Sequence, residues 1–205
     1  MGRKTLVEEP DLRTEAGLAQ KRASYINELG ELVYAWNALH ENLCEVFCAV
    51  LSVPFEVSTA IWHSIQSDRA QRNILRAATE NAELKPAAAR KSILWLVDQT
   101  NKLADKRNDA IHSPYAFVLY IQDPPVAELL PFAAMGNPRS RNLASKELLA
   151  EFRWYRETAT ALGGYAIRVR SGLLRPEEPW PDRPILPILT QKKTHPDRRR
   201  RRPGE

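Results

Sequence analysis

The spacing of apolar side chains predicts two long helices, one near the beginning of the chain and one near its end. Apolar residues that recur in alternating steps of three and four lie on one face of an α-helix. The first series consists of Tyr25, Leu29, Leu32, Trp36, Leu39, Leu43, Val46 and Val50, and the second of Leu148, Phe152, Tyr155, Ala159, Leu162, Ala166 and Val169. The opposite face of the first helix is mainly polar, as expected for a helix packed on one side of a bundle.

Further helices are predicted between these two. Apolar positions lie on both sides of Ser67-Asp68, which suits a helix cap, and the pattern leaves open whether residues 57–78 form one helix or two. A third long series consists of Ile93, Leu96, Thr100, Leu103, Arg107 and Ala110. Its helix is expected to end close to His112, because Pro114 disfavours helical geometry at Ser113.

Two segments depart from helical spacing. Residues 116–134 contain a β-like run, a Pro-Pro corner and a second apolar run, which predicts a small hairpin between helices. After Leu174, seven of the remaining 31 residues are proline and no amphipathic period survives. This tail is therefore expected to be disordered or held only by docking, with residues 184–189 (Pro-Ile-Leu-Pro-Ile-Leu) packing on a partner or on the bundle.

Together these patterns predict a mainly α fold, an antiparallel helical bundle with a small β-hairpin insertion. The expected organisation is a flexible N-terminus (1–14), one bundle domain (15–174) and a Pro/Arg-rich tail (175–205). The length of 205 residues, with 43% hydrophobic and 27% charged residues, fits one globular domain plus a tail.

Composition also bears on where the protein works. The two cysteines, Cys44 and Cys48, lie four apart in a helical pattern and are interpreted as buried apolar residues of a reducing compartment. No run of 18 apolar residues is present, and the first residues do not resemble a signal peptide. We therefore expect a soluble, cytoplasmic protein with no membrane partner.

The net charge of +5 is concentrated in the tail. Residues 175–205 hold nine basic and five acidic groups, so a basic face on the folded domain is not implied. The tail ends in a run of five arginines, Arg198, Arg199, Arg200, Arg201 and Arg202. These guanidinium groups suit the phosphate backbone of a nucleic acid, while the alternative is a solvated chain end.

The segment Arg107-Asn108-Asp109-Ala110-Ile111-His112 carries the main functional signal. Arg107 falls on an apolar stripe, where a buried guanidinium needs compensation by a carboxylate of the bundle or by a substrate phosphate. Five residues on a regular helix separate Arg107 and His112 by about 140°, so a helix break or a second subunit is needed to bring them together. Asn108 and Asp109 share the face of His112 and could hold its imidazole in one tautomer.

The segment has an Arg-x4-His pattern at a helix end, with Asn directly after the Arg, and the first long helix of the chain contains Trp36-Asn37. In these features the chain resembles the HEPN superfamily. The similarity covers about residues 20–170 in architecture and six residues in motif. It implies a homodimer in which Arg107 and His112 of both copies line one cleft. It further implies metal-independent RNA cleavage without a cofactor, in a toxin–antitoxin or antiphage setting that includes an antitoxin partner. The ribose 2′-hydroxyl would attack the adjacent phosphorus.

Two alternatives remain beside this ribonuclease hypothesis. The chain could be a catalytically inactive HEPN-like binding or scaffolding module, or an unrelated helical interaction protein in which Arg-x4-His is accidental. Some HEPN toxins carry a tyrosine two residues after the His that is modified with AMP. Tyr115 stands three residues after His112, so a packing or hydrogen-bonding role is favoured for it. His40 and His63 are interpreted as structural, and no HExxH, Walker or GxGxxG motif is present.

Overall fold

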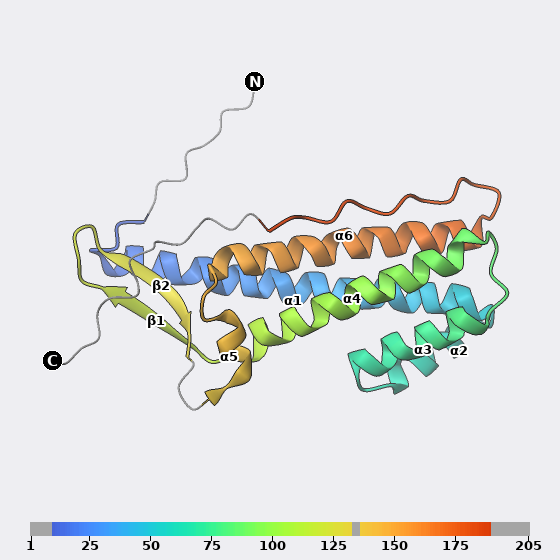
Figure 1. Ribbon diagram of the computed structural model, residues 1–205, viewed down its shortest axis with the longest axis horizontal. Helices are drawn as coiled ribbons and strands as arrows, with labels where there is room; N and C mark the ends of the chain where they lie inside the picture. The colour runs from blue at the N-terminus through green and yellow to red at the C-terminus, as the bar shows by residue number, and fades with distance from the viewer. Residues whose placement is uncertain (1–9, 133–135, 190–205) are drawn as a thin grey trace, which may run out of the picture.

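Three long helices form the body of the molecule in the computed structural model, which describes residues 10–132 and 136–189. They are α1 (Glu15–Leu51), α4 (Ala88–His112) and α6 (Leu148–Leu174), and they extend along the long axis (Figure 1). Ion pairs of Glu28 with Arg156 and of Glu45 with Arg170 join corresponding ends of α1 and α6, so these two helices run in the same direction. Helix α4 runs antiparallel to both (Figure 1). The predicted mainly α bundle with a small hairpin is confirmed.

The core lies between α1 and α6, with α4 packed against them. Of the eight predicted apolar positions on α1, seven are buried, and Leu29 is partly buried against the same core. The predicted apolar positions on α6 are all buried, including Phe152 and Tyr155. Cys44 and Cys48 are buried free thiols, as expected. Helix α1 ends at Leu51, and the next residue, Ser52, caps it in a left-handed backbone conformation with φ of 53°, shortly before Pro54.

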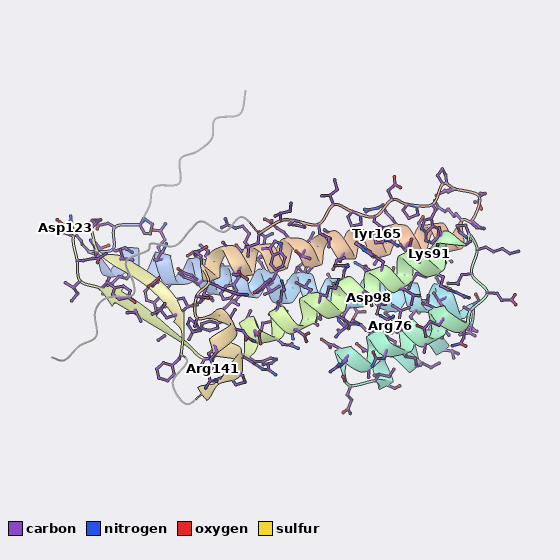
Figure 2. All side chains as sticks on the ribbon, viewed as in Figure 1. Arg76, Lys91, Asp98, Asp123, Arg141 and Tyr165 are labelled. Atoms are coloured by element: carbon purple, nitrogen blue, oxygen red, sulfur yellow. The ribbon has the colours of Figure 1, made fainter. Side chains whose placement is uncertain are left out.

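Two separate helices, α2 (Phe55–Ser64) and α3 (Asp68–Asn81), follow α1. The Ser67 side chain accepts a hydrogen bond from the backbone N–H of Ala70 at 3.3 Å and so caps α3, which settles the question that the sequence left open. Figure 2 shows Arg76 of α3 beside Asp98 of α4, and these side chains form an ion pair. Helix α3 therefore packs along α4, and Arg72 of α3 also bonds to Asn101 of α4.

The predicted hairpin follows α4 directly. Strands β1 (Tyr115–Tyr120) and β2 (Val126–Pro131) pair in antiparallel register, with Tyr115 opposite Pro131. A short helix, α5 (Pro138–Leu143), then packs near the end of α4 (Figure 1). The sequence did not predict α5, because its six residues are mostly polar and too few to display a helical period.

After α6 the described part of the tail returns along the bundle (Figure 1). The Trp180 indole N–H donates to Ser92 Oγ at 2.9 Å, and the Trp154 indole N–H donates to the carbonyl of Pro187 at 2.7 Å. A Cβ on Gly172 would lie 2.9 Å from the Trp180 ring, so glycine is needed for this close approach. Of the alternatives for residues 184–189, packing on the bundle is therefore the one observed. No helix within the described residues combines the length and the apolar character that crossing a membrane requires.

Candidate functional site

The guanidinium of Arg107 lies against an aromatic ring of α1. Its Cζ is 5.5 Å from the centroid of the Trp36 ring, and its Nη1 donates to the side-chain oxygen of Asn108 at 3.1 Å. The Nε atom is buried and has no acceptor within the described residues. Burial lowers the pKa of Arg107, and the nearby Asp68 carboxylate opposes this shift. No carboxylate of the described chain forms an ion pair with Arg107. The contacts of its guanidinium are the Trp36 ring and the Asn108 side-chain amide.

A second arginine shares the same ring. Arg72 of α3 is only 3% exposed, and its Cζ also lies 5.5 Å from the Trp36 centroid. Its Nε donates to Asn101 Oδ1 at 2.7 Å, and its Nη1 lies 3.0 Å from His40 Nε2. These contacts join α1, α3 and α4 through one buried guanidinium. The arrangement concentrates positive charge around Trp36.

His40 is a neutral member of this cluster. Burial is the largest of the effects that lower its pKa to about 4, and the neighbouring Arg72 adds to that shift while Asp68 opposes it. At neutral pH the ring therefore accepts the Arg72 hydrogen bond at Nε2 and donates from Nδ1 to Gln71 Oε1 at 3.3 Å. The 3.9 Å approach of His40 Nε2 to Asp68 is not an ion pair under these conditions. The predicted structural interpretation of His40 agrees with these contacts.

Asp68 supplies the negative charge of the cluster. Its Oδ2 accepts a hydrogen bond from the Trp36 indole N–H at 2.9 Å. Burial alone would raise the pKa of this carboxyl, but the Trp36 hydrogen bond and the positive field of Arg107 and Arg72 outweigh burial and lower it. Asp68 therefore stays ionised and holds the Trp36 indole, whose ring both arginines contact.

A polar pocket of about 420 Å³ opens beside this cluster. Its walls come from α1, the N-terminal half of α3 and the C-terminal half of α4. The lining residues are Trp36, Ser67, Asp68, Arg69, Arg72, Asn73, Asn101, Ala104, Asp105 and Asn108. The volume lies within the range of about 300–1,000 Å³ that is typical of small-molecule sites. The walls carry hydrogen-bond donors and acceptors, including positively and negatively charged side chains. Such a lining suits a polar ligand.

His112 does not join Arg107 within one chain. Helix α4 is regular through His112, so the helix break that would unite the two side chains is absent from this part of the structure. His112 is exposed at the end of α4, and among the described residues it forms no hydrogen bond or ion pair. The involvement of a second copy of the chain therefore stays a prediction.

The two residues expected to support His112 have other partners. The Asn108 side chain accepts from Arg107, and its carbonyl accepts from Arg139 Nη1 of α5 at 3.4 Å. The Asp109 carboxylate accepts from Asn142 Nδ2 of α5 at 2.8 Å. Within the described residues neither side chain bonds to the imidazole. The Asp109 side chain and the Asn108 backbone carbonyl instead attach α5 to α4.

Tyr115 is a structural residue. Its hydroxyl donates to the carbonyl of Ala110, and its ring meets Phe152 edge-on with centroids 5.9 Å apart. Burial raises the pKa of the Tyr115 hydroxyl, so the group stays protonated. These contacts agree with the favoured packing role. The other expected nucleic-acid contacts, Arg198, Arg199, Arg200, Arg201 and Arg202, lie outside the described residues.

Sequence reasoning missed the part of the site that α3 supplies. Arg72, Leu75 and Thr79 are buried at spacings of three and four, so Arg72 occupies an apolar stripe in the same way as Arg107. That spacing was the available signal. Asp68 was identified only as part of a helix cap, because its contact with Trp36 joins residues 32 positions apart. Within the described residues, no group of three or more His, Cys, Asp or Glu side chains is arranged to hold a metal ion.

In comparisons with known proteins, the chain matches no family model, no curated protein and no solved structure.

Proposed function

We propose that this protein is a HEPN-like, metal-independent endoribonuclease that acts as a homodimer through Arg107 and His112. The observation that carries the proposal is that Arg107 lacks a full set of polar partners. Its guanidinium is partly buried, its Nε has no acceptor, and no carboxylate of the described chain pairs with it. A desolvated guanidinium in this state is stabilised by a phosphate, which accepts hydrogen bonds from its planar donors.

The surroundings of His112 support the same proposal. Helix α5 carries two exposed arginines, Arg139 and Arg141, and Arg139 bonds to the Asn108 carbonyl of α4. Figure 2 shows Arg141 on α5 beside the end of α4. Neither arginine has an ion-pair partner among the described residues. Cations beside an exposed histidine favour binding of an RNA backbone, since phosphate contacts supply most of the sequence-independent affinity.

Chemistry at this site requires two copies of the chain. Arg107 and His112 diverge by about 140° on a regular helix, so each arginine would meet a histidine of the other copy across a two-fold axis. One imidazole takes the proton of the ribose 2′-hydroxyl while this oxygen bonds to phosphorus. The other imidazole protonates the departing 5′-oxygen, and the products carry a 2′,3′-cyclic phosphate and a 5′-hydroxyl. Arginine offsets the negative charge that develops on the phosphoryl oxygens.

The test compares single-stranded RNA cleavage by the wild-type chain and by His112→Ala, with EDTA present. General acid–base catalysis contributes about 10²- to 10⁴-fold, so a loss of this size is expected. His63→Ala is the matched control, because His63 is also an exposed histidine in the last turn of a helix. Light scattering of the same preparations should give twice the mass of one chain.

The outcomes separate the competing hypotheses. Cleavage retained in His112→Ala would mean that the catalytic residue is misplaced. RNA binding without cleavage by the wild type would favour the inactive binding module. An Arg107 guanidinium that lies against Trp36 is compatible with binding alone. A role in toxin–antitoxin or antiphage systems, with an antitoxin partner, belongs to the same proposal. It predicts that expression of the wild type, but not of His112→Ala, slows growth.

A further inference from the structure

The polar pocket beside Trp36 has unused hydrogen-bonding capacity on opposite walls. Asp105 of α4 and Arg69 of α3 are both exposed, and within the described parts of the chain neither forms a hydrogen bond or an ion pair. The side-chain amides of Asn101 and Asn108 accept from arginines through their oxygens, which leaves their N–H groups as donors. The pocket therefore presents one free carboxylate together with several free N–H donors.

This combination selects among the nucleobases. The Watson–Crick edge of guanine carries two adjacent N–H donors, which a carboxylate accepts side by side as it does from a guanidinium. Adenine and cytosine place a ring-nitrogen acceptor next to their amino group, which repels a carboxylate. Uracil places its single N–H between two carbonyls. Guanine also has acceptors at O6 and N7, for which arginine and amide N–H groups are suitable donors.

We propose that this pocket binds a guanine base of single-stranded RNA. The Asp105 carboxylate accepts the N1–H and N2–H groups, while Arg69 and the asparagine amides donate to O6 and N7. The inference rests on the proposed function in taking RNA as the source of the base. Single-stranded bases that are splayed out of the stack are commonly recognised on this edge in protein pockets.

The position of the pocket links it to the proposed catalytic arginine. Asn108 lines the pocket and also accepts the hydrogen bond of Arg107 Nη1 at 3.1 Å. Trp36 lines the pocket and is covered by the Arg107 guanidinium. A nucleotide with its base in the pocket therefore places a phosphate near Arg107. Cleavage is accordingly expected next to guanosine.

The binding experiment is calorimetric titration of the full chain with the 5′-monophosphates of guanosine, inosine, adenosine, cytidine and uridine. Guanosine monophosphate should bind at least about tenfold more tightly than each of the others, as one bidentate contact discriminates by about 1–3 kcal/mol. Inosine monophosphate is the sharpest comparison, because it lacks only the 2-amino group. Asp105→Asn should weaken guanosine monophosphate binding by about tenfold or more, since the new amide N–H opposes a base donor.

Asp182→Asn is the matched control, an exposed carboxylate far along the chain with no hydrogen bond or ion pair among the described residues. It should leave binding unchanged. Equal affinity for the five nucleotides, no binding of guanosine monophosphate, or wild-type affinity in Asp105→Asn would each overturn the inference. Wild-type RNA cleavage without guanosine monophosphate binding would leave the nuclease proposal standing and remove this one. Selective binding without cleavage would do the reverse.

Discussion

Replacement of His40 by glutamine should make the stability of the fold less sensitive to acid. His40 is 7% exposed and contacts Arg72, and burial is the main reason that its pKa falls to about 4 in the folded chain. In the unfolded chain the imidazole titrates near pH 6.5. A glutamine side chain can still accept from Arg72 and donate to Gln71, but it does not titrate.

The sign and size of the effect follow from proton linkage. Between pH 6.5 and pH 4 the unfolded chain binds more protons at this position than the folded chain does. Stability from this group is therefore complete above pH 6.5 and is lost as the pH falls toward 4. With a shift of this size, the free energy of unfolding should decrease by about 2 kcal/mol between pH 7.5 and pH 5 because of His40 alone.

The measurement is urea unfolding of the wild type and of His40→Gln at these two pH values. The wild type should lose about 2 kcal/mol more than the variant, because all other titrating groups are shared. His63→Gln, at an exposed histidine, should lose as much as the wild type. An equal loss in wild type and His40→Gln would refute the reasoning. So would an NMR titration that placed the His40 pKa near its ordinary value.

Two further predictions concern packing. Arg72→Met should reduce the free energy of unfolding by about 3 kcal/mol in urea, because it leaves one buried acceptor, on His40, and one partly buried acceptor, on Asn101, without their donor. Arg69→Met, at an exposed position, should change it by less than about 0.5 kcal/mol. Gly172→Ala should displace the Trp180 ring, which a Cβ would approach to 2.9 Å, and so speed proteolysis within residues 176–189. A Cβ on Gly30 would have no neighbouring atom within 4 Å, so Gly30→Ala should leave the proteolysis rate unchanged. The same rate in both glycine variants would contradict the packing of residues 176–189 on α6.

Much of the fold could be predicted because helical periodicity is a local property. The apolar stripes of α1 and α6 and the end of α4 at His112 follow from residue spacing and from Pro114. The hairpin was also predicted, from a β-like run before a Pro-Pro corner. Helix α5 was not, because six mostly polar residues carry no period, and contacts with Asn108 and Asp109 help to hold it.

The candidate site was predictable only in part. Arg107 was identified because it begins an Arg-x4-His pattern and because its guanidinium interrupts an apolar stripe, and both signals are contained in one helix. Arg72 interrupts a stripe in the same way, but α3 is short and the sequence left its extent open. The pairing of Asp68 with Trp36, and the pocket beside them, depend on residues far apart in the chain.

By itself the sequence determined the long helices, the turn from α4 into the hairpin and the presence of an arginine that needs compensation. Only the tertiary structure decided what surrounds that arginine, since it brings the Trp36 ring against Arg107, leaves its Nε without an acceptor among the described residues, and directs Asp109 to α5 instead of His112. The physical reason is that spacing along a chain specifies which face of a helix is apolar. Which polar groups meet is decided by how helices from separate parts of the chain pack together.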